Sequence, residues 1–126
     1  MADTRKKGML YLKRKLGNVP KQFVSASRFF PPENSWTGEE AWWFNLPIKK
    51  VKSNKKGYYY LLGAKTKKKS SFVILKVPIA FLISNLSRFE TRYDDKIMLH
   101  LAAYRKNWLV DERGKGRVDF SPFELK

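Results

Sequence analysis

The residues whose types and spacing come closest to catalytic chemistry are carboxylates that stand beside basic side chains. Asp111 and Glu112 directly precede Arg113, and Glu39 with Glu40 forms a second acidic pair. Paired carboxylates can hold a divalent metal ion that activates water for attack on a phosphate ester. The spacing around Asp111 and Glu112 fits no established motif of this kind, and acids next to bases are also typical of a salt-bridged turn. We favour the turn and keep hydrolysis as the alternative.

Other common catalytic arrangements are missing from the sequence. His100 is the only histidine, so it cannot form a histidine metal cluster, and its place between Leu99 and Leu101 predicts a partly buried strand residue. The chain has no cysteine, which excludes disulfides, thiolate metal sites and cysteine nucleophiles. It also has no Gly-rich phosphate loop, no GxSxG motif and no HExxH motif. The sequence therefore predicts no cofactor and no metal site.

Charge is the strongest functional signal in the sequence. The 27 Lys and Arg residues outnumber the 11 Asp and Glu residues, which gives a formal net charge of +16. From Ala41 to Phe89 there is no acidic residue at all. A charge of this size attracts polyanions and makes their binding sensitive to salt. We expect a nucleic acid, DNA or RNA, as the partner, and we expect no membrane association because the basic N-terminal segment has only a short apolar face.

Four basic clusters are the predicted nucleic-acid contacts. Lysine suits phosphate as a point charge, whereas base reading favours arginine in a fixed geometry. The chain has 19 lysines and 8 arginines, which predicts binding driven by charge and shape, with Arg113 and Arg117 as the expected specific contacts. The clusters are Lys13, Arg14 and Lys15; Lys49, Lys50, Lys52, Lys55 and Lys56; Lys65, Lys67, Lys68 and Lys69; and Arg113, Lys115 and Arg117.

The elements that must position these side chains follow from the pattern of apolar residues. A basic helix over 5–16 is expected to begin after Thr4 as its cap and to stop at Gly17. A connection over 18–40 is rich in proline and aromatic residues and is expected to be irregular. The remaining chain, 41–126, is predicted to contain strands at 41–48, 58–64, 72–77 and 96–104, a helix over 78–89, and a hairpin that pairs 108–110 with 117–120.

Short connections between the first three strands predict an antiparallel meander. Both turns of this meander carry lysines, and a middle strand of seven or eight residues would hold the two lysine tips about 25 Å apart. That distance is close to the width of a nucleic-acid duplex. The three tyrosines Tyr58, Tyr59 and Tyr60 of the middle strand alternate in direction, so we expect core and boundary residues here and no stacking platform for bases.

The predicted fold class is α+β. We expect one domain over 1–126 with a mostly antiparallel sheet of four or five strands, an N-terminal helix, and one helix between the third and fourth strands, in the order α-β-β-β-α-β-β. The sequence shows no evident internal repeat and no linker. It also shows no secretory signal and no apolar run long enough for a membrane span, so a cytoplasmic protein is expected.

The predicted order of elements over about 5–104 resembles the core of the PD-(D/E)XK nucleases. This resemblance implies a metal held by an Asp of the second strand and by an acid-x-Lys triplet of the third strand. The triplet here reads Ile74-Leu75-Lys76, so Lys76 matches the motif, but Ile74 stands where the acid would be and the second strand has no carboxylate. The resemblance therefore implies a catalytically degenerate copy that binds without cutting. The alternative for Lys76 is a lysine whose stem packs along the sheet.

Three functions remain open on the sequence alone. The first is a nucleic-acid-binding protein that contacts phosphates through its basic clusters. The second is a nuclease, or a degenerate relative of one, with Asp111, Glu112 and Lys76 as candidate catalytic residues. The third is a basic protein-interaction or inhibitor module that docks on an acidic protein surface.

Overall fold

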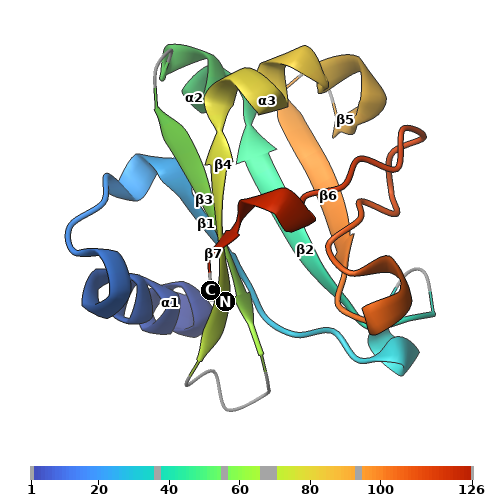
Figure 1. Ribbon diagram of the computed structural model, residues 1–126, viewed down its shortest axis with the longest axis horizontal. Helices are drawn as coiled ribbons and strands as arrows, with labels where there is room; N and C mark the ends of the chain where they lie inside the picture. The colour runs from blue at the N-terminus through green and yellow to red at the C-terminus, as the bar shows by residue number, and fades with distance from the viewer. Residues whose placement is uncertain (1, 36–37, 55–56, 66–70, 93–94, 126) are drawn as a thin grey trace.

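A computed structural model describes residues 2–35, 38–54, 57–65, 71–92 and 95–125 (Figure 1). Five of the predicted contact residues lie outside these ranges: Lys55, Lys56, Lys67, Lys68 and Lys69. The described chain is α+β, as predicted, with helices α1 (Ala2–Leu16), α2 (Ile48–Ser53) and α3 (Ile79–Ser84). The strands are β1 (Val24–Ser27), β2 (Ala41–Pro47), β3 (Tyr58–Ala64), β4 (Phe72–Pro78), β5 (Glu90–Arg92), β6 (Lys96–Ala102) and β7 (Glu124–Leu125).

The strands form two sheets, which corrects the expectation of a single mostly antiparallel sheet. One sheet has the order β1-β3-β4-β7, and its β1–β3 pair is parallel. The other sheet has the order β2-β6-β5 and is antiparallel. The predicted meander of β2, β3 and β4 is therefore wrong, because β2 pairs with β6 and only β3 and β4 are neighbours. Part of the expected lysine-rich turn before β3 is the short helix α2.

A strand–proline–helix unit occurs twice, which corrects the expectation of no internal repeat. Leu46–Asn54 reads LPIKKVKSN and Val77–Asn85 reads VPIAFLISN, so Pro, Ile, Ser and Asn recur at the same positions. In both copies a seven-residue strand ends in proline, a six-residue helix follows, and asparagine is the C-cap. Proline suits the start of each helix because its missing N–H would have no partner within the helix and its φ angle is already close to helical.

The two copies also pair with their neighbours in the same way. Pro47 lies opposite the first residue of β6, and Pro78 lies opposite the first residue of β3. In both copies the isoleucine after the proline donates its N–H to the carbonyl just before the partner strand, at 2.8 Å from Ile48 to Asp95 and at 3.1 Å from Ile79 to Gly57. The second copy thus pairs with β3, the strand that follows the first copy, whereas the first copy pairs with β6, which comes after β5. Helices α2 and α3 lie together at one end of the molecule (Figure 1).

Helix α1 covers one face of the β1-β3-β4-β7 sheet. Leu12 is buried there with Leu62 and Phe72. Gly8 permits the close approach, because a Cβ at this position would stand 3.1 Å from Leu62 Cδ1 and 3.3 Å from Phe72. Gly17 ends the helix at a φ of +83°, as predicted, with its N–H bonded to the carbonyl of Lys13. Thr4 is not the cap: it lies inside the first turn and is buried.

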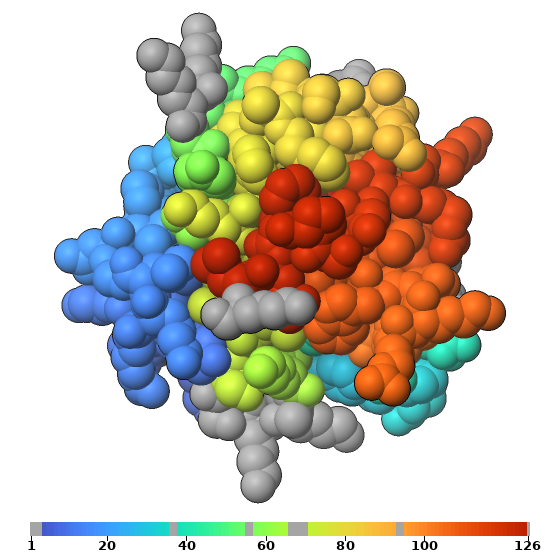
Figure 2. All heavy atoms as spheres, viewed as in Figure 1, coloured from blue at the N-terminus to red at the C-terminus, as the bar shows by residue number. Residues whose placement is uncertain are grey.

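A larger hydrophobic core lies between the two sheets and under α2 and α3. Trp42 of β2 packs its indole against Gly63 of β3 and donates its Nε1–H to the carbonyl of Ala64 at 2.8 Å. The C-terminal segment then crosses from the β2-β6-β5 sheet to the other sheet, where β7 pairs with β4 (Figure 2). The predicted pairing of 108–110 with 117–120 is present as an antiparallel bridge between Val110 and Asp119.

Candidate nucleic-acid interface

The predicted basic clusters lie on separate sides of the molecule. Helix α1 carries Lys13, Arg14 and Lys15 on one side, α2 carries its lysines at one end, and the loop with Lys115 and Arg117 lies on the side opposite α1 (Figure 1). Lys49, Lys50 and Lys52 are exposed on α2, and Lys65 is exposed at the far end of β3. The structure thus places cations near both ends of β3, as expected. At the start of β3, however, they belong to helix α2 and not to a hairpin turn.

Several cations line a groove along α1. It has a volume of about 510 Å³ and runs between the helix and the segment that follows it. Of the side chains that the structure describes, four cations and no carboxylate line it, and its apolar lining comes from α1 and from Val19. We call this surface the α1 groove. Its lining residues are Arg5, Lys6, Met9, Leu10, Leu12, Lys13, Gly17, Asn18, Val19 and Lys21.

The groove has this shape because the chain reverses after Gly17 and is fixed beside the helix. Arg5 donates hydrogen bonds to the carbonyl of Val24 at 2.6 Å and to the carbonyl of Lys21 at 2.8 Å. These bonds hold the start of β1 next to the first turns of α1. Lys6 and Lys13 are seven residues apart, so they project from the same side of the helix about 10 Å apart along its axis.

Basic residues predominate in α1 and in the segment that follows it, with Asp3 as the one acid of the helix. Between Thr4 and Pro32 the sequence contains eight Lys and Arg residues and no acid. Most acids of the chain instead belong to the β2-β6-β5 sheet, its flanking segments and the C-terminal loops, including Glu90, Asp111 and Glu112. This excess of basic residues makes the side of the molecule that α1 covers attractive to anions.

A second hollow lies where β1 and β2 run side by side without a backbone ladder. Ser25 Oγ donates to the carbonyl of Asn45 at 3.2 Å, and Ser27 Oγ accepts from the N–H of Trp43 at 2.9 Å. Because side chains join these strands, they stand farther apart than the usual 4.7–4.9 Å of paired strands. The resulting cavity of about 500 Å³ is the β1–β2 pocket. Its lining residues are Thr4, Arg5, Ser25, Ala26, Ser27, Arg28, Phe30, Trp43 and Asn45.

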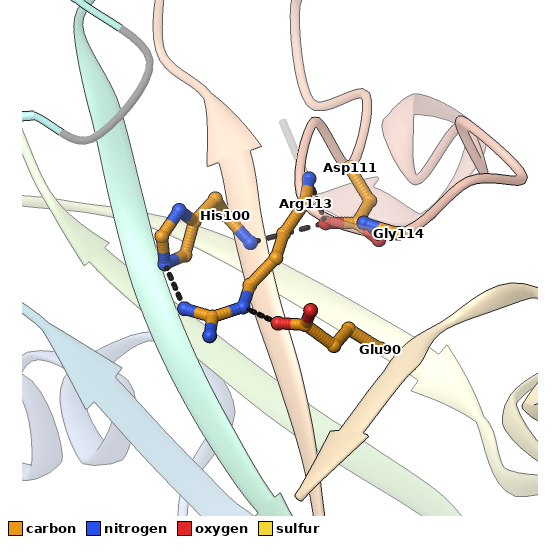
Figure 3. Close-up of polar contacts among 5 residues, drawn as sticks. All are labelled: Glu90, His100, Asp111, Arg113 and Gly114. Atoms are coloured by element: carbon orange, nitrogen blue, oxygen red, sulfur yellow. Dashed lines mark hydrogen bonds and ion pairs between the residues drawn. The ribbon is translucent and has the colours of Figure 1, made fainter.

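A column of stacked side chains continues from this pocket across the β2-β6-β5 sheet. The Arg28 guanidinium lies over the Phe30 ring at 4.6 Å, Phe30 stacks on Trp43 at 4.1 Å, and Trp43 stacks on His100 at 4.6 Å. Arg113 Nη1 lies 3.1 Å from His100 Nε2 and the Arg113 side chain also pairs with Glu90 (Figure 3). Arg113, predicted to be a specific contact, is thus engaged within the protein and is only 19% exposed.

His100 is buried, in agreement with the sequence. Burial and, to a smaller extent, the nearby Arg113 charge lower its pKa from 6.5 to about 4, against the opposing effect of Glu90. The imidazole is therefore neutral near pH 7. The imidazole stacks flat on the Trp43 indole of β2 and contacts the Arg113 guanidinium, so His100 connects β2 with the loop that carries Arg113.

The candidate catalytic carboxylates have structural contacts. Asp111 is fully buried and accepts hydrogen bonds from the N–H groups of His100, Arg113 and Gly114 (Figure 3). Its pKa is raised by burial, an effect that these three bonds oppose. Glu112 accepts a hydrogen bond from the Tyr104 hydroxyl. Lys76 lies over the Tyr58 ring at 4.4 Å. Within the described ranges, no three acidic or histidine side chains come together as metal ligands would.

In comparisons with known proteins, no family model, no curated protein and no solved structure matches this chain. Among the helices of the described residues, none has the length and apolar character needed to cross a membrane.

Sequence reasoning missed four cations that line the two hollows: Arg5, Lys6, Lys21 and Arg28. Lys21 and Arg28 are isolated basic residues, and Arg5 and Lys6 stand outside the four basic clusters predicted from the sequence. The local density of charge therefore did not identify them. Arg5 and Arg28 line the same pocket because Arg5 bonds to the carbonyl of Val24 at the start of β1 and Arg28 directly follows β1, a short Ser-rich strand that the sequence does not reveal.

Proposed function

We propose that this protein binds nucleic acid, with the α1 groove as its main contact surface. The observation that carries the proposal is the described lining of this groove, in which four cations stand without a carboxylate beside an apolar wall. Phosphates would contact the cations, while sugars and bases, which have apolar faces, would lie against the side chains of Met9 and Leu10. Arg14 and Lys15, exposed on the same helix, extend the positive surface.

The spacing of the groove lysines supports a polynucleotide over a single small anion. Lys6 and Lys13 stand about 10 Å apart along the helix, which is about three times the rise of about 3.4 Å per phosphate along one strand of a duplex. Lysine contacts of this kind bind the backbone and do not select a sequence. The exposed lysines of α2 would add contacts only with a strand that bends around the molecule or with a second strand.

The proposal is tested by anisotropy titrations with labelled single-stranded DNA, duplex DNA and single-stranded RNA. The test variant removes three groove charges: Lys6→Gln, Lys13→Gln and Lys21→Gln. The control variant removes three exposed charges from the opposite half: Arg92→Gln, Lys96→Gln and Lys106→Gln. We expect the groove variant to lose at least about tenfold in affinity and the control to lose much less.

Two results would contradict the proposal. No binding of the wild-type protein to any of the three nucleic acids at low salt would remove nucleic acid as the partner and favour the protein-interaction alternative. An equal loss of affinity in both variants would show that total charge, and not the α1 groove, determines binding. Incubation of the same nucleic acids with magnesium checks the nuclease alternative, for which Asp111→Asn and Glu112→Gln are the informative variants.

A further inference from the structure

The β1–β2 pocket combines a helix N-terminus with a buried hydroxyl that has no partner. Thr4 is 2% exposed, and its Oγ1 makes no hydrogen bond with any residue that the structure describes. Thr4 and Arg5 belong to the first turn of the 15-residue helix α1, where backbone N–H groups have no acceptor within the helix. A buried hydroxyl without a partner is costly, so its presence in the lining of a cavity points to a ligand atom that accepts its hydrogen bond.

Arg28 provides a fixed and available cation in the same pocket. Its guanidinium is held over the Phe30 ring at 4.6 Å, and it makes no hydrogen bond or ion pair with a described residue. Phe30 is itself held by its stack on Trp43, so the guanidinium has a defined position at low entropic cost. Among the residues whose side chains the structure describes, the pocket lining contains two arginines and no carboxylate, which favours an anion.

The two serines of the lining are already used and shape the pocket. Ser27 Oγ donates to the carbonyl of Arg28 at 2.8 Å while it accepts from Trp43 N–H. Ser25 Oγ bonds to the carbonyl of Asn45 and to the Tyr59 hydroxyl at 2.9 Å. The donors that remain for a ligand include the Thr4 hydroxyl, the Arg28 guanidinium and the carboxamide of Asn45, which is exposed at the rim. The buried Nε1–H of Trp43, another lining residue, also has no partner among the described residues.

We propose that the β1–β2 pocket binds the phosphate of one nucleotide, with Thr4 and Arg28 as the phosphate donors and Asn45 facing the nucleoside. Arg5 lines both this pocket and the α1 groove, so one strand can place a nucleotide in the pocket while its neighbours follow the groove. The volume of about 500 Å³ is within the range of small-ligand sites. The choice of a nucleotide over another phosphate compound rests on the proposed nucleic-acid function; the phosphate site itself rests on the pocket.

The test is a calorimetric titration of the full chain with three probes: inorganic phosphate, a nucleoside monophosphate and the same nucleoside without phosphate. We expect the monophosphate to bind more tightly than inorganic phosphate and the nucleoside to show no binding. Thr4→Val keeps the side-chain shape and Arg28→Gln removes the cation, and each is expected to weaken monophosphate binding about tenfold. Arg105→Gln, which removes an exposed arginine that is not part of the pocket lining, is the matched control and should bind as the wild type does.

Thermal unfolding of the variants separates a ligand-binding role from a structural one. Because the Thr4 hydroxyl has no partner in the described protein, Thr4→Val should leave the melting temperature unchanged or raised while it weakens binding. The pocket proposal is overturned if the monophosphate does not bind the wild type, or if it binds Thr4→Val and Arg28→Gln as tightly as the wild type. Inorganic phosphate that binds as tightly as the monophosphate would overturn the nucleotide assignment.

The two proposals fail in different ways. Oligonucleotide binding that depends on Lys6 and Lys13, without monophosphate binding, would retain the α1 groove and remove the pocket. Monophosphate binding that depends on Thr4 and Arg28, without binding of any oligonucleotide, would retain the pocket as a site for a free nucleotide and remove the proposed function.

Discussion

His100 lies between the indole of Trp43 and the guanidinium of Arg113, and these contacts give a single histidine a structural use. Its burial between apolar neighbours could be predicted from the strand pattern around it. Its partners could not, because Trp43 and Arg113 come from segments that lie far from it in sequence and meet it only through the β2–β6 pairing and the loop after β6.

The lowered pKa of His100 makes its contribution to stability depend on pH. The folded protein binds this proton only near pH 4, whereas the unfolded chain binds it near pH 6.5. The unfolded state therefore binds more protons between these values, and this part of the stability is lost as pH falls through the window from 6.5 to 4. We expect His100→Gln to lack this loss, so the variant should gain stability relative to the wild type on acidification.

Urea unfolding of both proteins at several pH values between 7 and 4 measures this difference. The raised pKa of Asp111 affects both proteins, so it largely cancels in the comparison. A difference in unfolding free energy that stays constant over the whole range would show that the His100 pKa is not lowered.

Gly63 and Gly8 are both close to neighbours but differ in what surrounds them. A Cβ at Gly63 would stand 2.7 Å from the rigid indole of Trp42, whereas a Cβ at Gly8 would meet the flexible end of Leu62 at 3.1 Å. We expect Gly63→Ala to cost about 1–3 kcal/mol through overpacking. Gly8→Ala should stay within about 1 kcal/mol of the wild type, because alanine raises helix propensity. Chemical denaturation checks both values, and equal effects would contradict the packing described here.

At the scale of elements, the repeated strand–proline–helix unit explains why α2 can be so basic. Lys49 and Lys52 of α2 stand where α3 has Ala80 and Ile83, and all four residues are exposed. Val51 stands where α3 has Leu82, and both are buried. The fold therefore requires an apolar residue at one position of each helix and leaves its neighbours open to charge.

This equivalence predicts the result of moving residues between the two helices. Lys49→Ala with Lys52→Ile, which copies α3, should change the unfolding free energy by about 0.5 kcal/mol or less. Val51→Asp should cost more than about 3 kcal/mol, because it buries a charge without a partner. Thermal and urea unfolding measure both. A large loss in the double variant would mean that the α2 lysines have structural partners and are not free for a ligand.

The sequence predicted the position of most elements but not how the strands pair. β3, β4 and β6 were located to within two residues because their apolar runs are continuous, and α1 stopped at Gly17 as expected. The predicted meander is wrong because the segment KKVKSN, expected to be a turn between two paired strands, forms most of helix α2. The strand before this helix, β2, pairs with β6 and not with β3. Strand β1 is short and Ser-rich, and its partner β3 lies more than thirty residues away, so no local pattern marks it.

For the whole molecule, the fold distributes the basic clusters over separate sides and forms one groove, along α1, that four cations line. Net charge could predict the class of partner to be tested, but it could not predict the surface. The α1 groove needs the chain reversal after Gly17 and the Arg5 hydrogen bonds that bring Lys21 beside the helix. The predicted role of the lysines at residues 66–70 concerns a segment outside the described residues and stays a prediction.

The most direct test of binding through the α1 groove is the dependence of nucleic-acid affinity on salt. For a duplex, the slope of log K against log salt concentration is about −0.9 for each phosphate that the protein neutralises. We expect a steep negative slope for the wild type, and we expect Lys6→Gln with Lys13→Gln to make it shallower by about 2, because two phosphate contacts are lost. The exposed pair Lys96→Gln with Lys106→Gln should leave the slope close to that of the wild type. A slope near zero in the wild type, or one unchanged by loss of Lys6 and Lys13, would contradict the account.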